Sequence, residues 1–302
     1  MRLAVAATPS IAIPTLRALS DSEHDLVAII TQPDRGAGRG KELRQTPVAS
    51  WAISNEIPLL KPLDSDELIE ISESVECVVT VGYGVILPES IINLPKHGYL
   101  NLHFSLLPKW RGAAPVQRAI QAGEKETGVS IFKLDRGMDT GPIYLQKKIA
   151  IPDEFRSQEL FEALSEIGAM AVLETLQGID EGVKPIPQSE NNATIAAKIS
   201  KEEARIEWNL SSSQIFRNIK AFYPAPIAWT LFRNEVVRIE SAKISGMDDL
   251  TPGELRVINR GLHVGTQDGA LEILTIVPAG KKSIDVGSWL NGARIQGNER
   301  FE

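Results

Sequence analysis

Short apolar runs alternate with helix-like segments through the first half of this 302-residue chain. Continuous apolar runs of about five residues suit strands that are buried on both faces of a parallel sheet. Five runs fit this description: Leu3–Ala7, Leu26–Thr31, Cys77–Val81, Tyr99–His103 and Val129–Leu134. Helices are expected to begin at Thr46-Pro47 and to span Asp64–Glu73 and Ala114–Ala122. The alternation predicts an α/β fold with a doubly wound sheet, whose ligand crevice lies at the carboxyl ends of the strands.

The second half of the chain has a different pattern. Residues 157–181 are predicted to form one long helix that Gly182 ends, and residues 183–192 are polar and contain two prolines. Ser211–Gln214 has capping-box spacing and predicts a short helix. Strands with turn residues between them follow at Val236–Ala242, Leu255–Ile258, Leu262–Gly265 and Leu271–Ile276. We therefore predict a domain over residues 1–182, a linker over 183–201 and a small antiparallel barrel over 202–302.

Several classes of protein are excluded or disfavoured by the sequence. The first predicted strand is followed by no G-x-G-x-x-G, and the chain contains neither a G-x-x-x-x-G-K-[ST] loop nor a G-x-S-x-G elbow. The single cysteine, Cys77, cannot form an internal disulfide, which suits a reducing cytoplasm. Four histidines without zinc-site spacing predict that the chain needs no metal. The net charge of −7 disfavours a protein that simply coats nucleic acid.

Three polar residues form the most informative constellation. Asn101 and His103 are two residues apart at the end of a predicted strand, so both project from the same side of the sheet. Asp139 lies in a glycine-flanked turn after the next predicted strand, within reach of the imidazole. An amide N–H stabilises a carbonyl oxygen that becomes negative, an imidazole moves a proton, and a carboxylate fixes the imidazole tautomer. The trio lacks a good nucleophile and predicts direct acyl-type transfer to an amine, although each residue also has a purely structural interpretation.

The residues around this trio match a longer pattern. Asn101-x-His103-x-Ser105-Leu106-Leu107-Pro108-x-Trp110-Arg111-Gly112, with the later Asp139-Thr140-Gly141, resembles the signature of the 10-formyltetrahydrofolate-dependent formyltransferase family. The resemblance runs nearly end to end and is strongest to the branch that acts on methionyl-tRNA. Residues 31–41 resemble its tRNA-contacting loop, 199–208 the entry to its second domain, and 278–282 a motif of that domain's barrel. Two positions depart from the family pattern, because Ala7 replaces a glycine and Phe104 replaces a small residue.

This resemblance implies a fold, a reaction and a set of site residues. The fold is a Rossmann-like formyltransferase domain followed by an OB-like β-barrel domain. The reaction moves a formyl group from 10-formyltetrahydrofolate to the amino group of methionyl-initiator tRNA, in a cytoplasmic protein that we expect to be a monomer. Asn101 would hold the formyl oxygen, His103 would stabilise charge and shuttle the proton, and Asp139 would orient His103. Whether His103 or Asp139 accepts the proton stays open. The folate-contacting residues would be Ser105, Leu106, Leu107 and Pro108.

A basic loop distinguishes the possible acceptors. Residues 34–46 carry Arg35, Arg39, Lys41 and Arg44 against two acidic residues, in a chain that is acidic as a whole. This loop suits a phosphate backbone, and we predict that Arg35, Arg39, Lys41, Lys281 and Lys282 bind tRNA. One alternative is a formyltransferase for a small amine, either a nucleotide-linked amino sugar or glycinamide ribonucleotide, which would use the same trio. Another is a non-catalytic RNA-binding protein built on the barrel.

Overall fold

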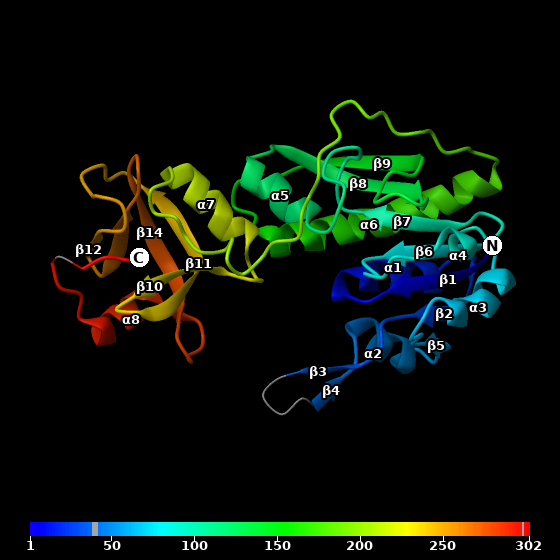
Figure 1. The fold of residues 1–302 in the computed structure, drawn as a ribbon, viewed down its shortest axis with the longest axis horizontal. Helices are drawn as coiled ribbons and strands as arrows, with labels where there is room; N and C mark the ends of the chain where they lie inside the picture. The colour runs from blue at the N-terminus through cyan, green and yellow to red at the C-terminus, as the bar shows by residue number, and fades with distance from the viewer. Residues whose placement is uncertain (38–41, 298) are drawn as a thin grey trace. The chain divides into compact units, whose positions relative to one another are not determined.

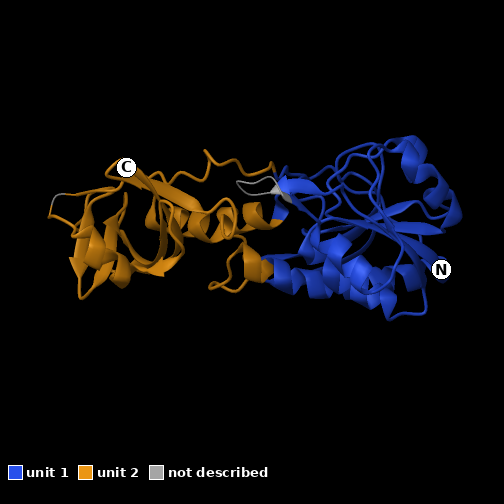
Figure 2. Cartoon of the chain, turned by 90° about the horizontal axis from the view of Figure 1, so that it is seen from below, with its two compact units in different colours: residues 1–115, 126–150, 161–196 blue, residues 116–125, 151–160, 197–302 orange. Residues whose placement is uncertain are grey.

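The computed structural model describes residues 1–37, 42–297 and 299–302. The described chain divides into two compact units, coloured separately in Figure 2. Unit 1 comprises residues 1–115, 126–150 and 161–196, and unit 2 comprises residues 116–125, 151–160 and 197–302. The predicted linker therefore does not stand apart, since residues 183–196 make their contacts within unit 1. That residues 1–182 and 202–302 fold independently stays a prediction.

A seven-stranded sheet forms the centre of unit 1 (Figure 1). Its strand order is β5-β2-β1-β6-β7-β8-β9, and the pairs from β5 to β7 are all parallel. The strands are β1 (Arg2–Ala7), β2 (Asp25–Ile30), β5 (Leu59–Leu60), β6 (Cys77–Val81), β7 (Tyr99–His103), β8 (Glu126–Lys133) and β9 (Ile143–Ala150). All five strands predicted for this half of the chain are confirmed.

One part of the sheet prediction is wrong. Strand β8 pairs antiparallel with β7, and β9, which the sequence analysis missed, pairs antiparallel with β8 at the edge of the sheet. The residues of β8 are buried over most of its length. A strand buried on both faces has the same continuous apolar pattern in either direction, so the sequence does not reveal its orientation. The sheet is consequently mixed, and its parallel part runs from β5 to β7.

Helices connect these strands along the chain. They are η1 (Ser10–Ala12), α1 (Ile13–Ser20), α2 (Pro47–Ser54), η2 (Asp66–Leu68), α3 (Ile69–Ser74), α4 (Glu89–Ile92), α5 (Pro115–Ala122) and α6 (Ser157–Asp180). Thr46 caps α2 as its sequence predicts, because its hydroxyl accepts a hydrogen bond from the Ala49 N–H at 3.0 Å. Helix α6 approaches β7 closely at Gly168, where an added Cβ would lie 2.7 Å from Leu102.

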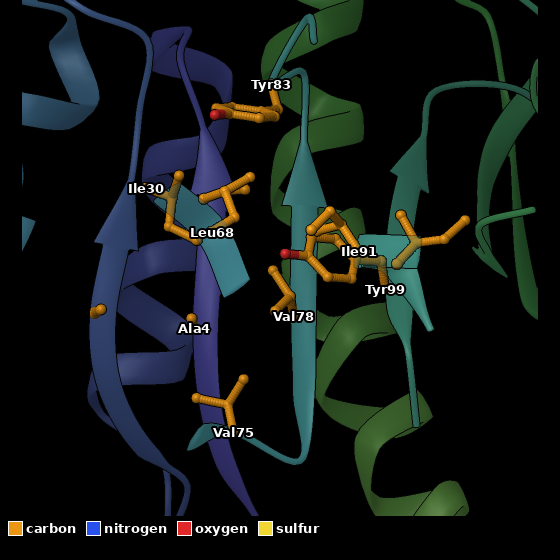
Figure 3. Packing of buried hydrophobic residues seen from close by; sticks show 11 residues of the cluster. Ala4, Ile30, Leu68, Val75, Val78, Tyr83, Ile91 and Tyr99 are labelled. Carbon is orange, nitrogen blue, oxygen red and sulfur yellow. The ribbon is translucent and has the colours of Figure 1, made fainter. Parts of the chain in front are cut away.

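The apolar core on one face of the sheet follows a period of two along the strands. Ala4 and Ala6 of β1, Ala28 and Ile30 of β2, and Tyr99 of β7 are almost fully buried in one cluster. Figure 3 shows that Tyr83 of this cluster lies beyond the carboxyl end of β6, at the opposite end from Val75. The core therefore extends to the end of the sheet at which the parallel strands finish, and Asn101 and His103 are at this end of β7.

Unit 2 contains the predicted antiparallel sheet. Its order is β10-β11-β14-β13-β12, with β15 paired to β14. The elements are α7 (Ser212–Ala221), β10 (Ala228–Phe232), β11 (Glu235–Ser245), β12 (Leu255–Ile258), β13 (Gly261–Gly265), β14 (Ala270–Pro278), β15 (Ile284–Asp285) and α8 (Val286–Ala293). Ser211 caps α7 by accepting from the Gln214 N–H at 3.2 Å, as the capping-box spacing predicts.

The C-terminal residues join the two edge strands of this sheet. Leu231 of β10 exchanges two backbone hydrogen bonds with Glu302, of 3.1 and 3.0 Å. At the other edge, the N–H of Leu255 in β12 donates to the carbonyl of Glu299 at 3.0 Å. The sheet is therefore closed into a barrel-like arrangement, which is why its edges are protected from pairing with other chains. The sequence predicts a small antiparallel barrel here, but not strands β10 and β15.

Candidate active site

A cavity of about 450 Å³ lies at the carboxyl ends of the parallel strands in unit 1. Segments that follow β1 and β6, together with the end of β7, form most of its wall. Asn101, His103 and Asp139 all line it, so the structure brings the predicted trio together. The remaining wall residues include Pro9, Ile11, Thr80, Gly82–Val85, Leu87, Gly112, Ala113 and Phe161.

The Asn101 side chain is held by the neighbouring strand. Thr80 of β6 is the register partner of Asn101 on β7, and its hydroxyl donates to Asn101 Oδ1 at 2.8 Å. The single proton of this hydroxyl is shared with the Leu100 carbonyl, which is 3.0 Å away. With its Oδ1 engaged by Thr80, Asn101 offers the cavity its amide N–H groups. Thr80 is not predicted from the sequence, since only the pairing of β6 with β7 brings it next to Asn101.

His103 is buried, and both of its ring nitrogens have partners. Nε2 lies 2.8 Å from the carbonyl oxygen of Trp110, and Nδ1 lies 3.6 Å from Oδ2 of Asp139. A carbonyl oxygen only accepts, so Nε2 carries a proton and Nδ1 is the nitrogen that titrates. Burial lowers the pKa of His103 below its ordinary value, while the Asp139 charge and the Trp110 carbonyl oppose that shift. His103 is therefore neutral at pH 7, with its unprotonated nitrogen beside a carboxylate.

Asp139 projects from a tight turn between β8 and β9. Its backbone has φ = 56°, a left-handed conformation that few residues with side chains adopt. Oδ2 accepts a hydrogen bond from the Gly112 N–H at 2.7 Å, so one carboxylate oxygen faces both this amide and the imidazole. The Asp135 carboxylate stabilises the start of the turn by accepting from the Gly137 N–H and the Thr140 hydroxyl. The carboxylate predicted to reach His103 does so.

The predicted folate-contacting residues lie elsewhere. None of Ser105, Leu106, Leu107 and Pro108, all within the described chain, lines the cavity that holds the trio. Their polar groups bond within unit 1: the Ser105 hydroxyl donates to the Lys109 carbonyl at 2.6 Å, and the Leu107 N–H donates to the Ser130 hydroxyl at 3.0 Å. Their role as folate contacts stays a prediction.

Residues 82–85, which the sequence analysis did not single out, line the cavity instead. Gly84 has φ = 76°, and an added Cβ would lie 2.9 Å from Nε2 of Gln32. That same Gln32 amide donates to the Tyr83 carbonyl at 2.7 Å, so a side chain at position 84 would strain the backbone and displace this bond. Burial raises the pKa of the Tyr83 hydroxyl to about 12. The available sequence signal was the pair of glycines directly after a buried strand.

The structure places only some of the predicted tRNA-binding residues. Arg35 begins β3 (Arg35–Ala37), which pairs antiparallel with β4 (Glu42–Arg44), and its guanidinium donates to the Gln32 side chain at 2.6 Å. Arg39 and Lys41 lie outside the described residues. Lys281 and Lys282 are exposed in unit 2, directly after β14.

Comparison with known proteins assigns the chain to a family. Residues 1–176 match the Formyl transferase family, and residues 198–294 match the Formyl transferase, C-terminal domain family. The chain is 39% identical over 308 residues to methionyl-tRNA formyltransferase of Rhodococcus erythropolis, with 100% of both chains covered. This chain belongs to the formyltransferase family. The amide, imidazole and carboxylate of this formyltransferase accordingly border one cavity, in the arrangement that the sequence predicts for formyl transfer.

Solved structures agree on the fold. The formyltransferase superimposes on HypX from Aquifex aeolicus, crystallised in complex with tetrahydrofolic acid, with a TM-score of 0.70 and 18% identity. That match covers 97% of this chain and 47% of the HypX chain. Methionyl-tRNA formyltransferase from Clostridium thermocellum gives a TM-score of 0.60 at 19% identity, over 81% of this chain and 94% of that one. No helix in the described ranges is long and apolar enough to cross a membrane.

Proposed function

We propose that this formyltransferase moves the formyl group of 10-formyltetrahydrofolate to the amino group of methionyl-initiator tRNA and so supports the initiation of translation. The observation that carries this proposal is the 39% identity, over the whole chain, to a methionyl-tRNA formyltransferase. The geometry supports it, since Asn101, His103 and Asp139 surround one cavity. That cavity has the volume of a small-molecule site and combines apolar walls with a few convergent polar groups, which fits the reactive end of a folate.

Asn101 and Thr80 handle the charge that develops during transfer. When bound, 10-formyltetrahydrofolate supplies the formyl carbon that the acceptor amine attacks. Asn101 directs an amide N–H at the formyl oxygen and stabilises it as it becomes negative, an effect worth about 10²–10³ in rate. Thr80 keeps the amide in the orientation that presents N–H rather than oxygen, because its hydroxyl occupies Oδ1.

His103 and Asp139 handle the proton. A free α-amine titrates near pH 8, so a substantial fraction is neutral and able to attack at physiological pH. Nε2 of His103 keeps its proton and donates a hydrogen bond to the Trp110 carbonyl. Nδ1 takes the proton that the attacking amine releases. The Asp139 carboxylate at 3.6 Å then stabilises the resulting imidazolium. His103 returns this proton to the folate nitrogen as its bond to the formyl carbon breaks, so that tetrahydrofolate leaves and the imidazole is neutral again. Of the two groups left open by the sequence, we assign His103 as the proton acceptor.

The finer assignments belong to the same proposal. Ser105–Pro108 would contact the part of the folate that lies outside the cavity, and the basic residues 35, 39, 41, 281 and 282 would contact tRNA. We also propose that the protein acts as a monomer in the cytoplasm.

A comparison of acceptors tests the proposed function. The purified protein is assayed with 10-formyltetrahydrofolate and either methionyl-initiator tRNA, an amino sugar nucleotide or glycinamide ribonucleotide. We expect efficient formylation of the tRNA alone. Formylation of a small amine with no activity on the tRNA would establish the alternative transferase. Tight tRNA binding without formylation of any acceptor would instead favour a non-catalytic RNA-binding protein.

Arg39 gives a second prediction, made from the sequence of the basic loop. Arg39→Ala removes one cation that contacts the tRNA backbone, so the logarithmic slope of kcat/KM against salt should flatten by about 0.7–0.9. A salt titration of wild type and variant with methionyl-initiator tRNA measures this slope, and folate affinity is the control that should not change. Equal slopes would make the loop a solvated surface segment, whereas a loss of folate affinity would move Arg39 to the donor site.

A further inference from the structure

The last segment of unit 1, residues 186–196, is hydrogen-bonded to the loops of the candidate active site. Arg111 exchanges backbone hydrogen bonds with Thr194 and Ala196, of 2.9 and 2.6 Å. Ile186 exchanges two bonds of 2.8 Å with Ile143, at the start of β9. The segment from 186 to 196 therefore runs from the Asp139 turn to the loop that follows His103, and both ends of it are fixed within unit 1.

Gln188 links these two loops through its side chain. Its Nε2 donates to the carbonyls of Asp139, at 2.9 Å, and Gly141, at 2.8 Å. Its Oε1 accepts from Nε and Nη2 of Arg111, at 3.1 and 2.9 Å. One amide thus satisfies two carbonyls of a turn in which Asp139 has a left-handed backbone, and it binds a guanidinium whose side chain is only 6% exposed.

The residues on each side of Arg111 hold the catalytic pair. The Trp110 carbonyl fixes Nε2 of His103, and the Gly112 N–H fixes the Asp139 carboxylate. Anchoring Arg111 therefore anchors a partner of His103 and a partner of Asp139 at once. Nδ1 of His103 and Oδ2 of Asp139 lie 3.6 Å apart, beyond the length of a hydrogen bond, so their separation depends on where these loops are placed.

We propose that Gln188 is a positioning residue for formyl transfer: by joining Arg111 to the Asp139 turn, it sets the distance between His103 and Asp139. This inference rests on the proposed function, since it assigns Gln188 a part in that same reaction. Gln188 does not line the cavity and acts only through the two loops. A displacement of about 1 Å in a catalytic group can cost about 10² in rate, which is the scale of effect expected here.

Gln188→Met tests the proposal, because methionine has a similar length but cannot donate to the turn or accept from Arg111. We expect kcat for formylation of methionyl-tRNA to fall about tenfold to 10²-fold while KM for the tRNA stays unchanged. Glu190→Met is the matched control: Glu190 also binds Arg111, at 3.2 Å, but its side chain is 78% exposed and bonds nothing in the Asp139 turn. We expect its kcat to fall far less than that of Gln188→Met, because Arg111 keeps both of its hydrogen bonds to Gln188 and the Asp139 turn keeps its own.

A titration of the His103 imidazole by nitrogen-15 NMR supplies a readout that does not depend on activity. Asp139 is the charged group that raises the pKa of His103, so a looser Asp139 turn lowers this pKa further in Gln188→Met and not in Glu190→Met. The His103 signal is identified by its absence from a His103→Ala spectrum. If Gln188→Met does not fold, Gln188→Glu, which keeps the acceptor for Arg111 and loses both donors, takes its place in the kinetic assay.

The outcomes separate the inference from the function it rests on. A wild-type protein that does not formylate methionyl-tRNA overturns the proposed function, and the NMR titration still tests the positioning. An active wild type with unchanged kcat and unchanged His103 pKa in Gln188→Met overturns the inference alone. Equal losses in Gln188→Met and Glu190→Met overturn it as well, because they would trace the effect to the pairing of Arg111.

Discussion

His103→Ala should reduce kcat/KM for formylation by about 10²–10⁴, the usual contribution of a positioned acid–base group. The variant loses the nitrogen that takes the proton and the cation that Asp139 stabilises, while Asn101 still binds the formyl oxygen. Residual activity should therefore remain above the uncatalysed rate. Steady-state kinetics with methionyl-initiator tRNA measure the loss, and a thermal melt shows that the protein is folded.

A matched histidine substitution provides the control for this prediction. His263 of β13 belongs to unit 2, where its Nδ1 bonds the Ser245 hydroxyl at 3.0 Å, and His263→Ala should leave kcat/KM unchanged. Asp139→Asn should cause a loss of similar kind, because an amide cannot stabilise an imidazolium. The double variant His103→Ala/Asp139→Asn should then be little worse than His103→Ala, since the pair acts as one unit. Activity of His103→Ala within threefold of wild type would remove the role assigned to this residue.

Local patterns in the sequence were enough to place the three candidate residues in one cavity. The two-residue spacing of Asn101 and His103 places them on one side of β7, and the glycine-flanked turn carries Asp139 to the same cavity. Most strands of both units were predicted in the same way. A strand buried on both faces is continuously apolar, and a strand buried on one face alternates between apolar and polar residues. These predictions needed only the periodicity of a strand and the chemistry of a turn.

The supporting residues needed contacts between distant parts of the chain. Thr80 lies 21 residues from Asn101 in sequence, and Gln188 lies 49 residues from Asp139. Segment 183–201 was assigned as a linker because prolines and polar side chains are typical of linkers. The structure instead pairs the backbone of Thr194 and Ala196 with Arg111. A polar segment that satisfies its hydrogen bonds on another loop has the same composition as one that satisfies them with water.

Replacement of Asn101 should have the second large effect. Asn101→Ala removes the N–H that stabilises the formyl oxygen, and we expect a loss of about 10²–10³ in kcat/KM. Asn101→Asp should be at least as damaging although it has the same size, because a carboxylate places negative charge where negative charge develops. Both variants keep His103 and Asp139, so the His103 pKa measured by NMR should change little in Asn101→Ala.

Substitutions of Thr80 test the orientation of the Asn101 amide while leaving the amide itself in place. In Thr80→Val the side chain keeps its shape but no longer donates to Asn101 Oδ1, so the amide is free to turn its oxygen towards the formyl group. We expect kcat to fall by a smaller factor than in Asn101→Ala, and Thr80→Ser, which restores the hydroxyl, to recover most of it. The loss should vanish when Asn101 is already alanine, because there is no amide left to orient. An equal loss from Thr80→Val in both backgrounds would mean that Thr80 acts on the packing of β6 against β7, and Asn101 would then present its N–H without help from the neighbouring strand.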